Sequence, residues 1–212
     1  QLIVSLFIFK DEIGLAALDV STGNFKVTQF NDDKTGSPLA DELQKMAPKE
    51  ILIPEALVDQ PKPWLPSGDP FLHSWEDWTY SHSEAVRNLL NHFKTQSLEG
   101  FGCENMSHGI SAAGALIHYL HETQKLALEH INSISPFYIH DYMALDQSTV
   151  TSLELIQSSE GTRKNSLLNL MDESCTPMGA RRIREWIIKP LIDSEKIKAR
   201  LEIVSIFKSL PL

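Results

Sequence analysis

Apolar and polar residues follow two different sequence patterns along the 212 residues of the chain. In the first hundred residues, short apolar runs alternate with turn signals, which is typical of strands separated by helices. Three strands are predicted first, the second and third joined as a hairpin, at 2–9, 12–20 and 24–30. A helix, a strand, an irregular proline-rich stretch and a second helix follow at 38–47, 50–54, 59–70 and 83–93. This order predicts an α/β fold for the first part.

The second half repeats its apolar residues with the helical period. A long helix is predicted at 107–131, and its apolar side carries Ile110, Ala113, Ile117 and Leu120. The stretch 135–148 is predicted to be extended. Three further helical segments follow, at 166–171, 176–189 and 193–208. An α/β domain is therefore expected to lead into an all-α domain, with the boundary at residue 103.

Charge is distributed unevenly between these parts. The whole chain carries a net charge of −9, but residues 1–160 carry −13 and residues 161–212 carry +4. Most of the chain would repel a phosphate backbone, so only the last part could lie near nucleic acid. Two cysteines, Cys103 and Cys175, are too few for a disulfide framework or a zinc cluster and fit a reducing cytoplasm. No apolar run is long enough to predict a membrane span.

Asp19 is the first candidate for chemistry, because it ends the second predicted strand. Nucleases of the ribonuclease H class carry a metal-binding aspartate on a strand of this kind. A two-metal site needs several converging carboxylates, and the neighbouring segments offer only Glu50 and Glu55 at the two ends of one strand. Aspartate also starts turns, because its side chain accepts hydrogen bonds from the backbone just ahead. We interpret Asp19 as a structural residue that shapes the hairpin.

Two motifs of the long helix fail as functional sites. Gly109 and Gly114 have the spacing of a phosphate-binding loop, but Ala115 and Leu116 follow where that loop needs Lys and Ser or Thr. Small residues for helix packing are the better interpretation. His121 and Glu122 begin like a zinc-protease helix, but Lys125 occupies the place of the second histidine. His118 and His121 are therefore expected to be polar side chains on a partly exposed helix.

The segment 176–189 is the most basic predicted helix. Arg181 and Arg184 share one side of it, and Trp186 belongs to its apolar face, with Met178, Ile183 and Ile187. A core helix with a solvated basic side is the simplest interpretation. A second is that Arg181 braces the next segment through carboxylate or carbonyl bonds, and direct DNA contact is a third.

Eight segments, taken in order, resemble the MutS family of DNA mismatch repair proteins over nearly the whole chain. The most specific is "SLLNLMDESCTPMGARRIREWIIKPL", because T-P-M-G-x-R followed by W and P-L is close to a family signature. The chain departs from the family pattern at Ser152, where Asn is usual, and at Met171, where Leu is usual. The other seven are "GLAALDVSTGNFKV", "ELQKMAPKEILIPE", "GFGCEN", "GISAAGALIHYLHETQK", "HINSI", "MALDQSTVTSLEL" and "IKARLEIV".

The resemblance implies that residues 1–103 form a connector domain with a ribonuclease H-like fold that lacks nuclease chemistry. Residues 104–212 would begin the helical core, or lever, domain. The sequence has no initiator Met and stops abruptly, so we expect it to be part of a longer protein. The mismatch-reading domain would precede it, and the clamp and ATPase domains would follow. No catalytic, cofactor-binding or metal-binding residue is expected in this part, whereas the full-length parent is expected to bind ATP and magnesium.

The resemblance also implies partners. MutL docks on the connector domain of the family, and the helix just before "GFG" takes part. In this chain that helix is 83–93, with Val86, Leu89, Leu90 and Phe93 expected inside and Arg87, Asn88 and Asn91 expected outside. The full-length parent is expected to be a cytoplasmic homodimer that binds mismatched DNA through domains outside this sequence. No membrane is expected among its partners. Two functions remain open: a non-catalytic coupling module that offers MutL a docking surface, and an active ribonuclease H-like nuclease.

Overall fold

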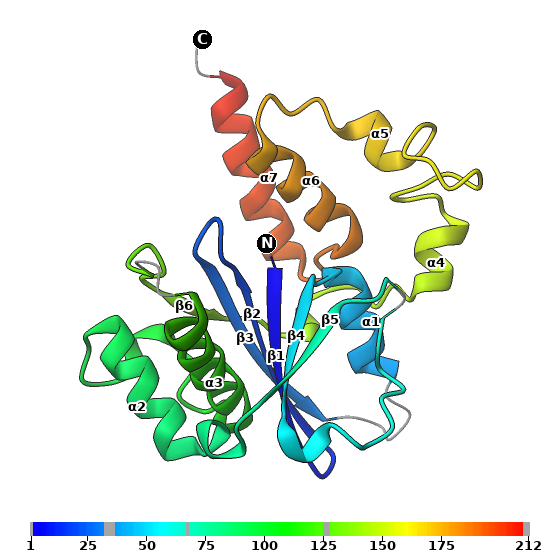
Figure 1. Ribbon diagram of the computed structural model, residues 1–212. Coiled ribbons are helices and arrows are strands. Elements are labelled where there is room, and N and C mark those ends of the chain that lie inside the picture. The colour runs from blue at the N-terminus through cyan, green and yellow to red at the C-terminus, as the bar shows by residue number, and fades with distance from the viewer. Residues whose placement is uncertain (1, 32–36, 67, 125–127, 210–212) are drawn as a thin grey trace. The chain divides into compact units, whose positions relative to one another are not determined.

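The computed structural model describes residues 2–31, 37–66, 68–124 and 128–209, and the chain divides into two compact units (Figure 1). The first unit comprises residues 1–138 and the second residues 139–212. The predicted boundary at residue 103 therefore lies inside the first unit. The reason is α3 (Ser107–Gln124), which packs against β1, β2 and β3 of the sheet and so belongs with the α/β part rather than with the helices that follow.

The first unit is built on a six-stranded mixed sheet with the order β5-β4-β1-β2-β3-β6. The three predicted N-terminal strands are confirmed and form an antiparallel meander: β1 (Leu2–Phe9), β2 (Glu12–Asp19) and β3 (Asn24–Asn31). Parallel pairing then extends both edges. β4 (Glu50–Pro54) pairs with β1, β5 (Phe71–Trp75) pairs with β4, and β6 (Ile134–Pro136) pairs with β3. The sequence predicted β4, but not β5 or β6.

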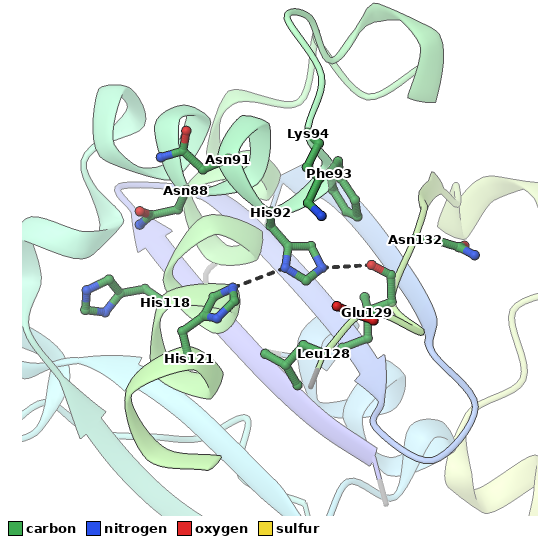
Figure 2. Close-up of a pocket in the computed structure, with 11 residues that line it drawn as sticks. Asn88, Asn91, His92, Phe93, Lys94, His118, His121, Leu128, Glu129 and Asn132 are labelled. Carbon is green, nitrogen blue, oxygen red and sulfur yellow. Dashed lines mark hydrogen bonds between the residues drawn. The ribbon is translucent and has the colours of Figure 1, made fainter. Parts of the chain in front are cut away.

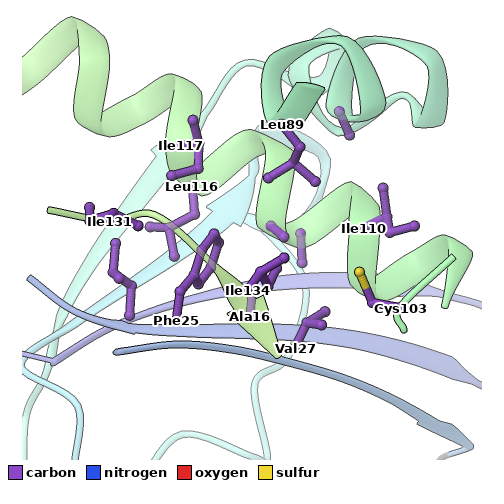
Figure 3. Packing of buried hydrophobic residues seen from close by; sticks show 14 of the residues in the cluster. Ala16, Phe25, Val27, Leu89, Cys103, Ile110, Leu116, Ile117, Ile131 and Ile134 are labelled. Carbon is purple, nitrogen blue, oxygen red and sulfur yellow. The ribbon is translucent and has the colours of Figure 1, made fainter. Parts of the chain in front are cut away.

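Both faces of the sheet are covered, which explains why β1 is apolar at every position except Ser5. Successive side chains of a strand point to opposite faces. Ile3 and Leu18, which are paired across β1 and β2, belong to the core cluster beneath α3, whose packing Figure 3 shows. Val4 points the other way and is fully buried as well. On that side lies α1 (Ser37–Met46), which carries the fully buried Leu39 and Leu43 (Figure 1).

Two helices stack on the first face of the sheet, α3 directly on it and α2 (His82–Phe93) against α3. Gly114 makes the close approach possible, because a Cβ atom on it would lie 2.2 Å from the Cα atom of Ala85. This confirms the packing interpretation of the failed phosphate-loop motif. All four predicted apolar residues of α3 are buried. The helix was predicted to reach residue 131, but residues 128–131 form a turn, and residues 125–127 lie outside the described ones.

The second unit is helical, with α4 (Gln147–Ser152), α5 (Leu167–Met171), α6 (Pro177–Ile188) and α7 (Ser194–Ser209). The predicted helix starts are confirmed. Thr176 caps α6 by accepting a hydrogen bond from the Gly179 N–H at 3.1 Å, and Asp193 caps α7 by accepting one from Glu195 at 2.8 Å. α4 was not predicted, although Asp146 caps it in the same way. Short 3-10 helices also occur among the described residues, at Glu55–Leu57, Asp77–Tyr80, Glu99–Phe101 and Ile139–Asp141.

Large apolar side chains remain exposed on the helices of the second unit. No residue of α7 is buried, and Leu201 and Phe207 of this helix are 61% and 69% exposed. On α6, Met178 is 69% exposed. Isolated exposed apolar residues are ordinary, but this density on adjacent helices indicates faces that are built to be covered. In the part of the chain that is described, no helix combines the length and the apolar character that crossing a membrane requires.

Candidate functional site

The helix predicted to dock a partner is α2. Leu89 is fully buried, and Val86, Leu90 and Phe93 are half-buried against the core, so the predicted inner face is confirmed in outline. Ala85 completes it, because its small side chain lies where Gly114 brings α3 closest. The helix ends at Phe93, and the next residue, Lys94, adopts a left-handed conformation with φ 53° and donates its N–H to the Leu90 carbonyl.

The three candidate docking residues of α2 do not share one environment. Arg87 is exposed and forms an ion pair with Glu84 one turn earlier, and Asn91 is exposed as well. These two side chains lie four residues apart and hence on one side of the helix. Asn88 was predicted to face outward, but it is half-buried, and its Nδ2 atom is buried without a hydrogen-bond partner. The predicted outward orientation of Asn88 is therefore wrong, because Asn88 faces the cavity that it shares with His118 and His121 of α3. Its part in partner binding stays a prediction.

A cavity of about 720 Å³ opens beside the C-terminal half of α2 (Figure 2). Asn88 and Asn91 line it, whereas Arg87 does not. The opposite walls come from α3 and from the turn that precedes β6. The remaining lining residues are His92, Phe93, Lys94, His118, His121, Leu128, Glu129, Ile131 and Asn132. Asn88 therefore lies at a cavity wall, although its Nδ2 atom is itself buried.

His92 is the central polar group of this cavity. Its Nε2 atom lies 2.8 Å from the Ile131 carbonyl oxygen, and its Nδ1 atom lies 3.1 Å from Nε2 of His121 (Figure 2). A carbonyl can only accept, so His92 carries its proton on Nε2 and offers a lone pair at Nδ1. Burial lowers the pKa of His92, the hydrogen bond to Ile131 opposes this, and the nearby His121 and His130 lower it further. Together these effects favour the neutral form of His92.

The pairing of His92 with His121 was not predicted from the sequence. The sequence predicts His121 only as a polar side chain on a partly exposed helix, and the two residues lie 29 positions apart on different helices. Only the packing of α2 on α3 brings them together. His118, one turn earlier on α3, makes a different contact, because its Nδ1 atom accepts a hydrogen bond from the Trp75 indole at 3.2 Å.

Asp19 closes the β2–β3 hairpin, as predicted. Its carboxylate accepts hydrogen bonds from the Ser21 N–H at 3.1 Å and from the Ser21 hydroxyl at 3.0 Å. Its carbonyl accepts from the N–H groups of Thr22 and Gly23, and Gly23 has a φ of 70°, which glycine adopts without strain. Partial burial would raise the pKa of Asp19, and hydrogen bonds, those from Ser21 among them, lower it below its ordinary value.

The carboxylates near Asp19 do not converge on it. Glu50 is paired with Ile3, and Ile3 with Leu18, so these three side chains share the face beneath α3. Asp19 follows Leu18 and points to the opposite face. Among the described residues, no group of three or more His, Cys, Asp or Glu side chains is placed to hold a metal ion.

In the second unit, the two structural candidates of α6 have separate contacts. Trp186 is covered by the Arg200 guanidinium of α7, which lies 4.1 Å from the ring centroid. This stacking joins α6 to α7. Arg181 donates a hydrogen bond from Nε to the Pro177 carbonyl at 3.3 Å, one turn back in its own helix. Bracing of the next segment by Arg181 stays a prediction.

Comparison with known proteins places this chain among DNA mismatch repair proteins. Residues 1–132 match the family model for MutS domain II, and residues 148–211 match that for MutS domain III. The DNA mismatch repair protein MutS of Halothermothrix orenii is 42% identical over 207 residues, which cover 95% of this chain and 22% of that protein.

Two further MutS proteins are similar over the same region. That of Salinibacter ruber is 38% identical, covering 92% of this chain and 21% of its own length, and that of Methanosarcina barkeri is 35% identical, covering 95% and 23%. The chain thus spans less than a quarter of the length of these relatives.

Proposed function

The chain belongs to the MutS family of DNA mismatch repair proteins, and from this premise we propose that it is a non-catalytic module coupling the two working ends of a longer repair protein. The observation that carries the proposal is the order of the two family domains, II and then III, within less than a quarter of the length of the relatives. Other domains of the full-length protein would bind mismatched DNA, ATP, magnesium and a second copy of that protein. The full-length protein would act in the cytoplasm.

A ribonuclease H-like fold of the first unit is part of this proposal. What supports it is the strand order β3-β2-β1-β4-β5, in which three antiparallel strands are followed by two that run parallel to β1. The competing function, an active nuclease on this fold, needs carboxylates that converge on two cations. Asp19 is engaged in its turn and points away from the face that carries Glu50. The geometry thus favours the coupling module.

MutL is the proposed partner of α2. Arg87 and Asn91 share an exposed side of the helix, where an arginine and an amide suit a polar, hydrated interface. Asn88 would take part from the cavity wall, through the part of its side chain that lines the cavity. An arginine at the centre of an interface can contribute strongly, whereas one at the rim mainly alters the association rate.

The test is the double variant Arg87→Glu with Asn91→Ala in the full-length protein. Recruitment of MutL to a mismatch, measured by surface plasmon resonance, should fall by about tenfold or more, which corresponds to the loss of one central contact. Mismatch binding and ATP hydrolysis should be unchanged. Lys198→Glu is the matched control, because it also reverses the cation of an i,i+3 ion pair on a helix surface. Unchanged recruitment in the double variant would rule out α2 as the docking helix.

A further inference from the structure

We propose that His92 and His121 form a two-histidine binding site for a transition-metal cation of the Zn²⁺ class, completed by water from the cavity beside α2. The inference rests on three features that occur together. Two imidazole nitrogens from different helices face each other, the outer nitrogen of one ring is held by a backbone carbonyl, and a cavity of about 720 Å³ adjoins the pair. Each of these features limits which ligand fits.

The spacing of the two nitrogens suits a shared cation. Zn²⁺ lies about 2.0–2.1 Å from each histidine nitrogen. For ligand–metal–ligand angles between right-angled and tetrahedral, two such nitrogens are separated by roughly 2.9–3.4 Å. His92 Nδ1 and His121 Nε2 are 3.1 Å apart. The cation would lie to one side of the line that joins them, and the exposed ring of His121 has the freedom to tilt toward it.

His92 is oriented as metal-binding histidines usually are. Such residues donate the N–H of the second ring nitrogen to a carbonyl or a carboxylate, which fixes both the tautomer and the direction of the ring. The 2.8 Å contact between His92 Nε2 and the Ile131 carbonyl does this and leaves the Nδ1 lone pair directed at His121.

The rest of the coordination sphere would be water, with Glu129 on the cavity wall as a nearby negative charge. The described residues offer no third histidine, cysteine or carboxylate in position. His118 lines the same cavity, but its Nδ1 atom is occupied by the Trp75 indole, and its ring packs edge-on against Trp78. Imidazole ligands suit Zn²⁺, Ni²⁺ and Cu²⁺ and do not suit Mg²⁺, which prefers oxygen.

A bound cation would join three segments of the first unit. His92 belongs to α2 and His121 to α3, and the Ile131 carbonyl belongs to the turn that leads into β6. A ligand that binds only the folded state stabilises it, so saturating Zn²⁺ should raise the melting temperature of this unit.

Isothermal titration calorimetry of the 212-residue chain with ZnCl₂ at pH 7.5 tests the proposal. We expect saturable binding of one Zn²⁺ per chain, no heat of binding with MgCl₂, and a higher melting temperature with Zn²⁺. His121→Ala, at an exposed position that should not disturb folding, is expected to weaken binding by at least about tenfold and to abolish the thermal shift. His118→Ala is the matched control on the same helix and should bind as the parent does.

Three outcomes would overturn the proposal. The first is no saturable Zn²⁺ binding by the parent chain, which would leave the two histidines as a plain hydrogen-bonded pair. The second is equal affinity in His121→Ala, which would assign the binding to other histidines of the surface. The third is an equal loss in His118→Ala and His121→Ala, which would place the site elsewhere on α3. His92→Gln, which keeps a polar side chain at the half-buried position, provides the second ligand variant and should lose binding like His121→Ala.

Discussion

The contact between α2 and α3 at Gly114 can be tested by adding a single methyl group. In Gly114→Ala the new Cβ atom would lie 2.2 Å from the Cα and 2.6 Å from the carbonyl oxygen of Ala85. Carbon atoms pack at about 3.5–4.0 Å, so the two helices would have to separate by about 1.3 Å or more. The obstacle is backbone, which cannot rotate away as a side chain can, so the cost should lie near the upper end of the usual overpacking range of about 1–3 kcal/mol.

The same substitution has an opposing effect, because alanine favours a helix over glycine by about 1 kcal/mol. The net expectation is a loss of about 2 kcal/mol in the free energy of unfolding of the first unit. For a chain of this size, that corresponds to a melting temperature lower by about 4–8 °C.

Urea unfolding followed by tryptophan fluorescence is a suitable assay, since Trp64, Trp75 and Trp78 all belong to the first unit. Gly100→Ala is the matched control, because a Cβ atom at that glycine would meet nothing within 4 Å. If Gly114→Ala unfolds within about 0.5 kcal/mol of the parent chain, or is more stable, then the close approach of α2 to α3 is wrong.

Two further predictions concern the two units. In calorimetry, residues 1–138 should melt cooperatively and residues 139–212 should not. The reason is that α6 and α7 leave apolar side chains such as Met178 and Phe207 exposed. A cooperative melt of a monomeric 139–212 fragment would contradict this. Hydrogen bonds from Ser174 and the ion pair with Arg163 lower the pKa of Asp172, so its stabilising effect is complete above about pH 4 and is lost as the pH falls through the folded-state value. Asp172→Asn should therefore be less stable than the parent in urea at pH 6, and the difference in stability should shrink as the pH falls below about 4. A difference in stability that does not change with pH would count against this role of the carboxylate.

The parts of the fold that follow local patterns could be predicted from the sequence. β1, β2 and β3 form one meander of neighbouring segments, and each carries enough residues to show its apolar run. The helix starts at Thr176 and Asp193 were visible because a capping residue acts on the backbone two or three positions ahead. β5 has only five residues with no clear alternation and is positioned by its pairing with the distant β4.

The division between the units could not be read from periodicity. The apolar and small residues of α3 predict a helix with several contact faces, but they do not say whether a sheet or other helices cover them. The candidate site shows the same limit. The exposure of Arg87 follows from the helical period, whereas the turn of Asn88 toward α3 and the approach of His92 to His121 depend on how two helices pack.

The pairing of β6 with β3 has a mechanical consequence for the chain that leaves the first unit. Pro136 ends this strand in register with Val27, and the Phe137 N–H is still bonded to the Val27 carbonyl at 2.9 Å. The second unit begins at Ile139, three residues after Pro136. Three extended residues reach at most about 11 Å, so the linker between the end of β6 and the start of the second unit is very short. A force applied at the start of the second unit would therefore act directly on the edge strand β6, because no loop lies between them that could first extend.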